Sequence, residues 1–180
     1  MKHAIRAEML AKRDSLPEDE RKRLSEVISS NIVQRPAFMQ ANTIAVYLAK
    51  GSEVSMRRTI ELAMAAGKTV LVPVTNQHLE MFQFTGFGNL HVGKFGILEP
   101  KDKIQGPAPE VVLVPGIAFG KCMHRIGYGK GFYDKYFKTV KTHRIGVCYD
   151  FQLLEKLPSH SQDEPMDEII TDRRIALPKP

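Results

Sequence analysis

The sequence predicts an α/β protein built around buried, mostly parallel strands, and two observations carry this prediction. Residues 43–48, 55–66 and 69–73 read in turn as a strand, a helix and a strand, which is the order of a βαβ unit. Residues 111–114 are four consecutive apolar residues, the pattern of a short strand that is buried on both faces. Strands covered on both faces occur in sheets flanked by helices, so we expect an α/β fold.

The length and composition favour one globular domain that spans residues 1–180. The chain has 180 residues, of which 43% are hydrophobic and 26% charged, enough to form a substantial core. No apolar run approaches the roughly 18 residues of a membrane span, and the N-terminus has no secretory signal pattern. Cys122 and Cys148 have no metal-like spacing. We therefore expect a cytoplasmic protein in a reducing environment, with Cys122 as a bystander thiol.

The chain opens with two predicted helices. Residues 2–13 have helical periodicity, and Lys2 and Arg6 lie four apart on one side of that helix. This basic face is either simply solvated or part of an anion site. Residues 14–18 break the helix, and Ser15 with Glu18 predicts a capping box that starts a second helix running to about Gln34.

The strand at 43–48 leads into a loop at 49–53, and open α/β sheets bind ligands at this end of their strands. Glu53 either accepts a hydrogen bond from a substrate nitrogen or favours the dipole of the next helix. Strands are predicted at 69–73 and 80–84. Residues 86–109 contain five glycines and three prolines together with several large apolar residues. We expect a loop packed over the core or over a ligand, and the sequence leaves both open.

Further elements follow the strand at 111–114. A helix is predicted at 131–138, a strand at 144–149, a short helix at 151–157 and a last strand at 169–171. The acidic loop at 163–168 contains Asp163 and Asp167, which are either solvated turn residues or part of a site.

The glycine-rich loop between Arg125 and Asp134 is the clearest functional motif. It follows a buried strand and precedes a helix, an arrangement that exposes backbone N–H groups to a phosphate. It is neither a Walker A loop, because Gly131 follows Lys130, nor a GxGxxG motif. The alternative is a surface turn with solvated lysines. Asp134 is an oxygen ligand of the kind that Mg²⁺ prefers.

The net charge of +6 is concentrated near this loop. Residues 121–144 contain seven Lys or Arg and one acidic residue, Asp134, which favours an anionic ligand. No helix-turn-helix, ribonucleoprotein or zinc-finger pattern is present, so we do not expect a nucleic-acid partner.

The motif resembles the signature of the 5-formyltetrahydrofolate cyclo-ligase family, also called methenyltetrahydrofolate synthetases. The resemblance is carried by Pro115-Gly116, Ala118-Phe119 and the run RIGYGKGFYD at 125–134, and it extends across essentially the whole chain. Two departures are small: Phe132 stands where many members have tyrosine, and Gln162 where histidine or asparagine is common. The resemblance implies a three-layer α/β/α sandwich, in agreement with the alternation of elements.

The resemblance also assigns roles to residues. Those it assigns to ATP are Lys2, Arg6, Arg125, Gly127, Gly129, Lys130, Gly131 and Tyr133. Those it assigns to the folate are Leu48, Glu53, Tyr128, Gly129, Lys130, Gly131 and Phe132. Asp134 and Asp167 would hold Mg²⁺, and the catalytic contributions would come from Lys130, Arg125 and Glu53.

The implied reaction is the ATP-dependent conversion of 5-formyltetrahydrofolate to 5,10-methenyltetrahydrofolate, with release of ADP and phosphate. Phosphorylation turns the formyl oxygen into a leaving group, and the folate's own N10 then attacks. No covalent nucleophile of the protein is required, and no Ser-His-Asp or Cys-His arrangement stands out. The surplus lysines would attract a polyglutamate tail, and we expect a monomer.

Two other functions compete with this prediction. A phosphate-using α/β enzyme such as a sugar-phosphate isomerase would keep the glycine loop without needing Mg²⁺ at Asp134. A small basic nucleic-acid-binding protein would show steep salt dependence and no ATP turnover.

Overall fold

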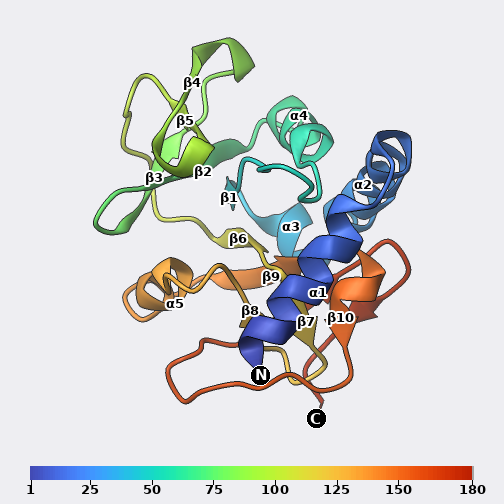
Figure 1. Cartoon of the computed structure of the whole chain (residues 1–180). Helices are drawn as coiled ribbons and strands as arrows, with labels where there is room; N and C mark the ends of the chain where they lie inside the picture. The colour runs from blue at the N-terminus through green and yellow to red at the C-terminus, as the bar shows by residue number, and fades with distance from the viewer. Residues whose placement is uncertain (180) are drawn as a thin grey trace.

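The structure, a computed structural model that describes residues 1–179, is organised around a seven-stranded sheet (Figure 1). The strand order is β12-β11-β9-β6-β1-β2-β3. Their bounds are β1 (Thr43–Val46), β2 (Thr69–Thr75), β3 (Leu79–Gln83), β6 (Val111–Pro115), β9 (His143–Val147), β11 (Glu168–Ile170) and β12 (Ile175–Ala176). The strands from β11 to β2 pair in parallel, and only the edge strands β3 and β12 are antiparallel. The predicted α/β fold with a mostly parallel sheet is confirmed.

Three helices cover one face of the sheet. They are α2 (Glu18–Val33), α3 (Pro36–Gln40) and α4 (Arg57–Ala65). Ile44 and Leu113 face this side and pack with Ile28 and Ile60, all of them fully buried. Because successive strand residues point to opposite faces, the next residues along each strand face the other side.

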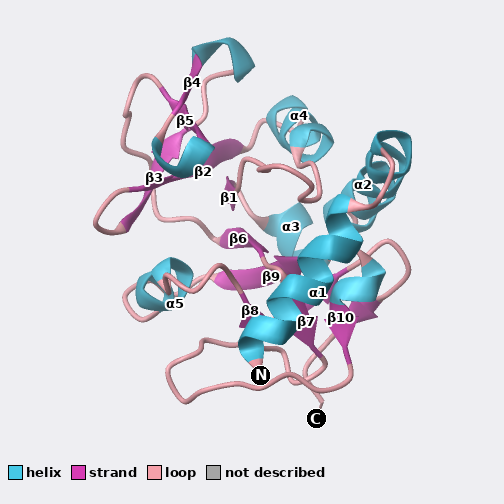
Figure 2. Ribbon diagram, in the orientation of Figure 1, coloured by secondary structure: helices cyan, strands magenta, loops and turns pink. Residues whose placement is uncertain are grey.

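The second face is covered by a helix and by a small sheet (Figure 2). The helix is α5 (Phe132–Phe137), and the small sheet has the order β10 (Leu153–Leu154), β7 (Ala118–Gly120) and β8 (Arg125–Ile126). Phe119 is fully buried between the sheets and packs with Val112 and Val114. The outer side of the small sheet is covered by α1 (Lys2–Asp14), through Met9. The second outer layer is therefore only partly helical.

Several predicted boundaries need correction. The capping box is wrong, because α2 begins at Glu18 with Pro17 as its N-cap, while the Ser15 hydroxyl donates to the Lys12 carbonyl at 2.7 Å. Ser15 still belongs to the end of α1, so its side chain cannot cap the next helix. The predicted helix at 151–157 is instead the 3-10 turn η3 (Asp150–Gln152) followed by β10.

The irregular segment 86–109 contains structure of its own. It forms the 3-10 turns η1 (Phe87–Asn89) and η2 (Lys94–Gly96) and a hairpin of β4 (Leu90–Val92) and β5 (Leu98–Pro100). The helix α3, which begins at Pro36, was not predicted either. Within the described part of the chain, every helix is too short or too polar to cross a membrane.

Candidate active site

A cavity of about 490 Å³ lies where β1, β2 and β6 end. Tyr47 and Leu48 follow β1, Thr75 ends β2 and Pro115 ends β6, and all four line the cavity. The rest of the lining comes mainly from α1, the loop after β1, the start of β3, β8 with the glycine-rich loop, the start of α5, the turn η2 and the loop around Asp163. The volume is that of a small-molecule site, and it lies at the carboxyl ends of parallel strands, as the sequence predicted.

The glycine-rich loop forms one wall of this cavity. It runs from the end of β8 to Gly131, the N-cap of α5. Gly129 and Gly131 have φ angles of 92° and 66°, a left-handed conformation that glycine adopts without steric cost. In this turned loop Lys130 is exposed. The loop lines the same cavity as Pro115, at the end of β6.

The first helix closes against this loop. Arg6 donates from Nε to the Gly127 carbonyl at 2.8 Å, and both Lys2 and Arg6 line the cavity. The structure therefore brings Arg6 to the loop, although 121 residues separate it from Gly127 in sequence, and it brings Lys2 to the same cavity. The alternative of a merely solvated basic face does not apply to this pair.

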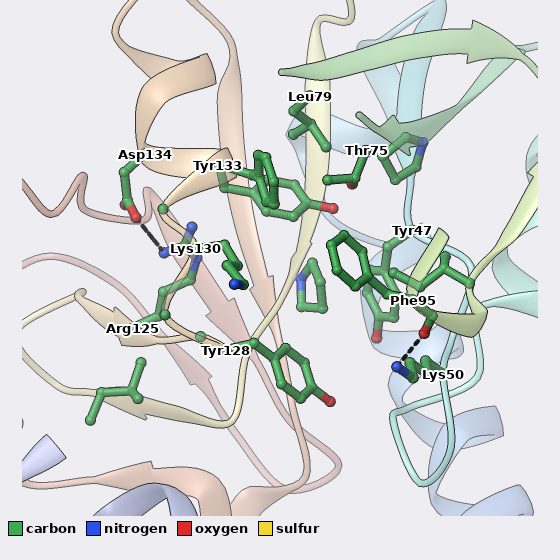
Figure 3. A pocket seen from close by; sticks show the side chains of 18 of the residues that line it. Tyr47, Lys50, Thr75, Leu79, Phe95, Arg125, Tyr128, Lys130, Tyr133 and Asp134 are labelled. Carbon is green, nitrogen blue, oxygen red and sulfur yellow. Dashed lines mark hydrogen bonds and ion pairs between the residues drawn. The ribbon is translucent and has the colours of Figure 1, made fainter. Parts of the chain in front are cut away.

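Arg125 and Asp134 lie at the base of the loop (Figure 3). The Arg125 side chain is only 6% exposed, and its Nη1 lies 3.2 Å from Oδ1 of Asp134. Burial lowers the pKa of Arg125, and the Asp134 carboxylate opposes that shift. The Arg125 guanidinium also lies over the Tyr133 ring, 5.5 Å from its centroid. These contacts hold a buried positive charge at the cavity wall.

Two aspartates line the cavity, Asp134 and Asp163, in addition to Glu53. Oδ2 of Asp163 accepts hydrogen bonds from Lys2 Nζ at 2.7 Å and from the His160 backbone N–H at 2.8 Å. Burial works to raise the pKa of Asp163, but these hydrogen bonds outweigh it and lower the pKa. Asp163 is therefore ionised at neutral pH and faces the same space as Asp134.

Asp167 has a different environment from the one predicted for a metal ligand. Its side chain is exposed, accepts a hydrogen bond from the Arg144 backbone N–H at 2.8 Å and is not part of the cavity lining. Among residues 1–179, no group of three or more His, Cys, Asp or Glu side chains could hold a metal ion. Mg²⁺ is usually held by one or two carboxylates together with substrate phosphates and waters, and Asp134 with Asp163 provides such a set.

The opposite wall is apolar and aromatic. Figure 3 shows Tyr47 and Phe95 across the cavity from Arg125, Lys130 and Asp134. Phe95 belongs to η2, and its φ of 59° is unusual for a residue with a side chain. Lys50 donates from Nζ to the Phe95 carbonyl, which ties this turn to the loop after β1. Residues 86–109 take both positions that the sequence left open: Phe87 and Leu90 pack against the core, and Phe95 and Ile97 line the cavity.

Glu53 lies beside this apolar wall. Its Oε2 accepts the Lys50 backbone N–H at 2.8 Å, and its Oε1 accepts the Tyr128 hydroxyl at 3.3 Å. Burial raises the pKa of Glu53, although these hydrogen bonds and nearby positive charges oppose the shift. Glu53 lies in the loop before α4, which begins only at Arg57, so it is not in the first turn of that helix.

With one exception, the residues that the sequence predicted for the site lie around this cavity, and further residues also line it. Every residue predicted for ATP or folate lines the cavity, as does Asp134, whereas Asp167 does not. Asp163, which the sequence left open as either a solvated turn residue or part of a site, lines the cavity. The lining residues that the sequence did not single out are Tyr47, Lys50, Pro73, Thr75, Leu79, Phe95, Ile97, Pro115, Ile126 and His160. The position of most of them at strand ends was the only available signal.

Comparisons with known proteins agree on one family. The model of the "5-formyltetrahydrofolate cyclo-ligase family" matches residues 1–172. The chain is 27% identical to the 5-formyltetrahydrofolate cyclo-ligase of Escherichia coli K12, over 91% of this chain and 96% of that protein. It is 28% identical to the probable 5-formyltetrahydrofolate cyclo-ligase of Schizosaccharomyces pombe, over 82% of this chain and 83% of that protein.

A solved structure gives the same result. The NMR structure of Aquifex aeolicus 5,10-methenyltetrahydrofolate synthetase is similar to this chain with a TM-score of 0.88 and 32% sequence identity. The similarity covers 99% of this chain and 93% of the Aquifex chain, so it extends over nearly the whole fold.

Proposed function

The chain belongs to the 5-formyltetrahydrofolate cyclo-ligase family, and from this premise we propose that it converts 5-formyltetrahydrofolate to 5,10-methenyltetrahydrofolate with consumption of ATP. It is an enzyme of the ligase class. The products of the proposed reaction are the methenyl compound, ADP and phosphate.

One observation carries the proposal: a single cavity combines a basic glycine-rich wall with an apolar, aromatic wall that holds the half-buried carboxylate of Glu53. The first wall suits the phosphates of ATP, and the second suits a flat pterin ring with polar nitrogens at its edge. A site for phosphate alone would not need the second wall.

The chemistry requires an activated formyl oxygen. In the first step this oxygen attacks the γ-phosphorus of ATP, the bond to the bridging oxygen breaks, and ADP leaves. In the second step N10 attacks the formyl carbon and loses its proton, and the C–O bond breaks as phosphate departs with the electron pair. Both steps need positioning and charge stabilisation more than a protein nucleophile.

The basic wall would perform the first part of this work. Lys130 and the backbone N–H groups of the glycine loop would bind phosphate oxygens, and the buried guanidinium of Arg125 would add a fixed positive charge beside them. Lys2 and Arg6 close the site from α1. Gly129 and Gly131 hold the loop backbone in left-handed turns, and a loop that is already turned would need little rearrangement to bind the nucleotide.

We assign Mg²⁺ to Asp134 and Asp163 rather than to Asp134 and Asp167. Both carboxylates line the cavity and supply the hard oxygen ligands that this ion prefers, whereas Asp167 is directed to the Arg144 backbone. When bound, the ion would neutralise charge on the phosphate oxygens.

The folate would occupy the other end. Leu48, Tyr128 and Phe132 offer apolar surface, and the Glu53 carboxylate is placed to accept a hydrogen bond from a pterin nitrogen. The basic surface of residues 121–144 gives a physical reason for a polyglutamate tail to bind more tightly than a single glutamate.

The test is growth of the methenyltetrahydrofolate absorbance band after the protein is mixed with Mg·ATP and 5-formyltetrahydrofolate. We expect the band to grow with ATP and to stay flat both without ATP and with the Asp134→Ala variant. A flat trace from folded protein that still binds ATP would reject the proposal.

A further inference from the structure

Arg13 is a buried arginine just outside the cavity, in the last turn of α1. Only 3% of the residue is exposed. Its Nε donates to the Ser52 hydroxyl at 3.0 Å, and its Nη2 donates to the Tyr128 hydroxyl at 3.0 Å. Within residues 1–179 it forms no direct ion pair with a carboxylate. A buried guanidinium that is held only by hydroxyl groups is costly for stability, which suggests a functional reason for its position.

The two hydroxyl groups that accept hydrogen bonds from Arg13 donate hydrogen bonds to carboxylates in turn. Because arginine can only donate, each hydroxyl oxygen must accept from Arg13, and each hydroxyl hydrogen is left to point elsewhere. The Tyr128 hydroxyl donates to Oε1 of Glu53 at 3.3 Å, and the Ser52 hydroxyl donates to Oδ1 of Asp14. Arg13 thus fixes the direction of both hydroxyl groups.

The same helix also supports the nucleotide side of the cavity. Arg6 and Arg13 lie seven residues apart, about two helical turns, and so share a face of α1. Arg6 donates to the carbonyl of Gly127, and Arg13 donates to the side chain of Tyr128, the next residue of the loop. The Tyr128 side chain is half exposed, so these polar contacts, more than packing, determine where its hydroxyl lies.

We infer that Arg13 is a positioning residue for the folate side of the site: it holds the Tyr128 phenol as a donor to Glu53 and anchors the loop at Ser52. This inference rests on the proposed function, in which Glu53 binds the pterin. Arg13 does not line the cavity, so it acts through Tyr128 and Ser52 and not by contact with a substrate.

The charges around Glu53 give the expected direction of the effect. Besides Arg13, the groups that act on Glu53 are Lys50 from its own loop, Tyr128, the buried Tyr47 and the partly buried Tyr133. Burial disfavours the Glu53 carboxylate, and the positive charge of Arg13 and the Tyr128 hydrogen bond favour it. Removal of Arg13 weakens both favourable interactions, so Glu53 should become easier to protonate.

The first test needs no substrate. The Glu53 carboxylate is titrated by ¹³C NMR in the wild type, in Arg13→Gln, in Tyr128→Phe and in Lys12→Gln. Lys12 is the matched control, because it is a neighbouring cation on α1 whose exposed side chain pairs only with Glu8. We expect the pKa of Glu53 to rise in the first two variants and to stay unchanged in the control. An unchanged pKa in Tyr128→Phe overturns the inference even if Arg13→Gln fails to fold.

The second test uses turnover. In Arg13→Gln we expect the KM for the folate to rise about tenfold, the size typical of a lost charge-assisted hydrogen bond, and the KM for ATP to change less than about twofold. Arg13→Lys should restore part of the folate KM, since it keeps the charge but cannot reach both hydroxyls. Arg13→Gln should add little to Tyr128→Phe. A lower melting temperature with an unchanged folate KM would reduce Arg13 to a structural role.

The two tests distinguish a failure of the inference about Arg13 from a failure of the proposed function. If the wild type shows no ATP-dependent turnover, the proposed function fails, while the NMR titration still decides whether Arg13 sets the state of Glu53. If the wild type turns over and Arg13→Gln matches it in both tests, the inference alone fails.

Discussion

Asp163 and Asp167 lie in one loop, and we expect the loss of the Asp163 carboxylate, but not of the Asp167 carboxylate, to lower activity. Asp163 is largely covered and accepts hydrogen bonds from Lys2 at 2.7 Å and from the His160 N–H at 2.8 Å, within the cavity. Hydrogen bonds to a charged group contribute about 1.5–3 kcal/mol each, and an asparagine would keep a weakened form of one of them. For Asp163→Asn we therefore expect the stabilisation of the transition state to fall by about 1.5 kcal/mol. This corresponds to a decrease of roughly tenfold in kcat/KM for ATP.

Asp167→Asn is the matched variant. This side chain is exposed and caps only the Arg144 backbone N–H, so its effect on unfolding free energy should stay within about 0.5 kcal/mol. Its kcat/KM should then remain within about twofold of the wild type.

The assay measures initial rates against ATP at several free Mg²⁺ concentrations. Because we assign Mg²⁺ to Asp163, the Asp163→Asn defect should shrink as Mg²⁺ rises, which a defect in Lys2 placement alone would not do. The opposite ranking, with Asp167→Asn impaired and Asp163→Asn normal, would refute the reasoning and restore the original prediction from sequence.

Three further outcomes are expected. Lys130→Ala should abolish most turnover and change the unfolding free energy by less than about 0.5 kcal/mol, because Lys130 is exposed. Glu53→Gln should lower activity but raise Tm at neutral pH. Burial raises the pKa of Glu53, so the folded state loses stability as pH rises through that pKa. The gain in Tm should therefore vanish below about pH 4.3, the ordinary pKa of glutamate. Gly146→Ala should destabilise the fold by about 1–3 kcal/mol in urea denaturation, because the added Cβ overpacks the core. That Cβ would lie 2.5 Å from the Phe119 ring, whereas Gly88→Ala meets no atom within 4 Å and serves as control.

Each of these has a contrary result. A Lys130→Ala variant that retains most of its turnover would argue against phosphate binding at the loop. A pH-independent Tm difference for Glu53→Gln would show that its charge is not the source of the effect. Equal stability of the two glycine variants would contradict the close packing of Phe119 between the sheets.

Much of the fold follows from local sequence signals. The apolar runs at β1, β2 and β6 are almost entirely buried on both faces, and this composition favoured strands over surface helices. The glycine-rich loop was equally readable, because left-handed turns require glycine at particular positions. The wrong predictions are at short segments with little sequence pattern. At residues 151–157 the structure has a 3-10 turn and a two-residue strand in place of the expected helix.

From the amino-acid pattern alone one can predict most of the central sheet, the glycine-rich loop, the resemblance to one family and the basic face of α1. Three features appear only in the folded chain: Asp163 and not Asp167 faces the cavity, Phe95 lines it, and Arg13 donates a hydrogen bond to Tyr128. The difference comes from the distance along the chain over which each feature is set. Strand and turn preferences depend on neighbours in sequence, whereas the direction of Asp163 depends on Lys2, 161 residues away.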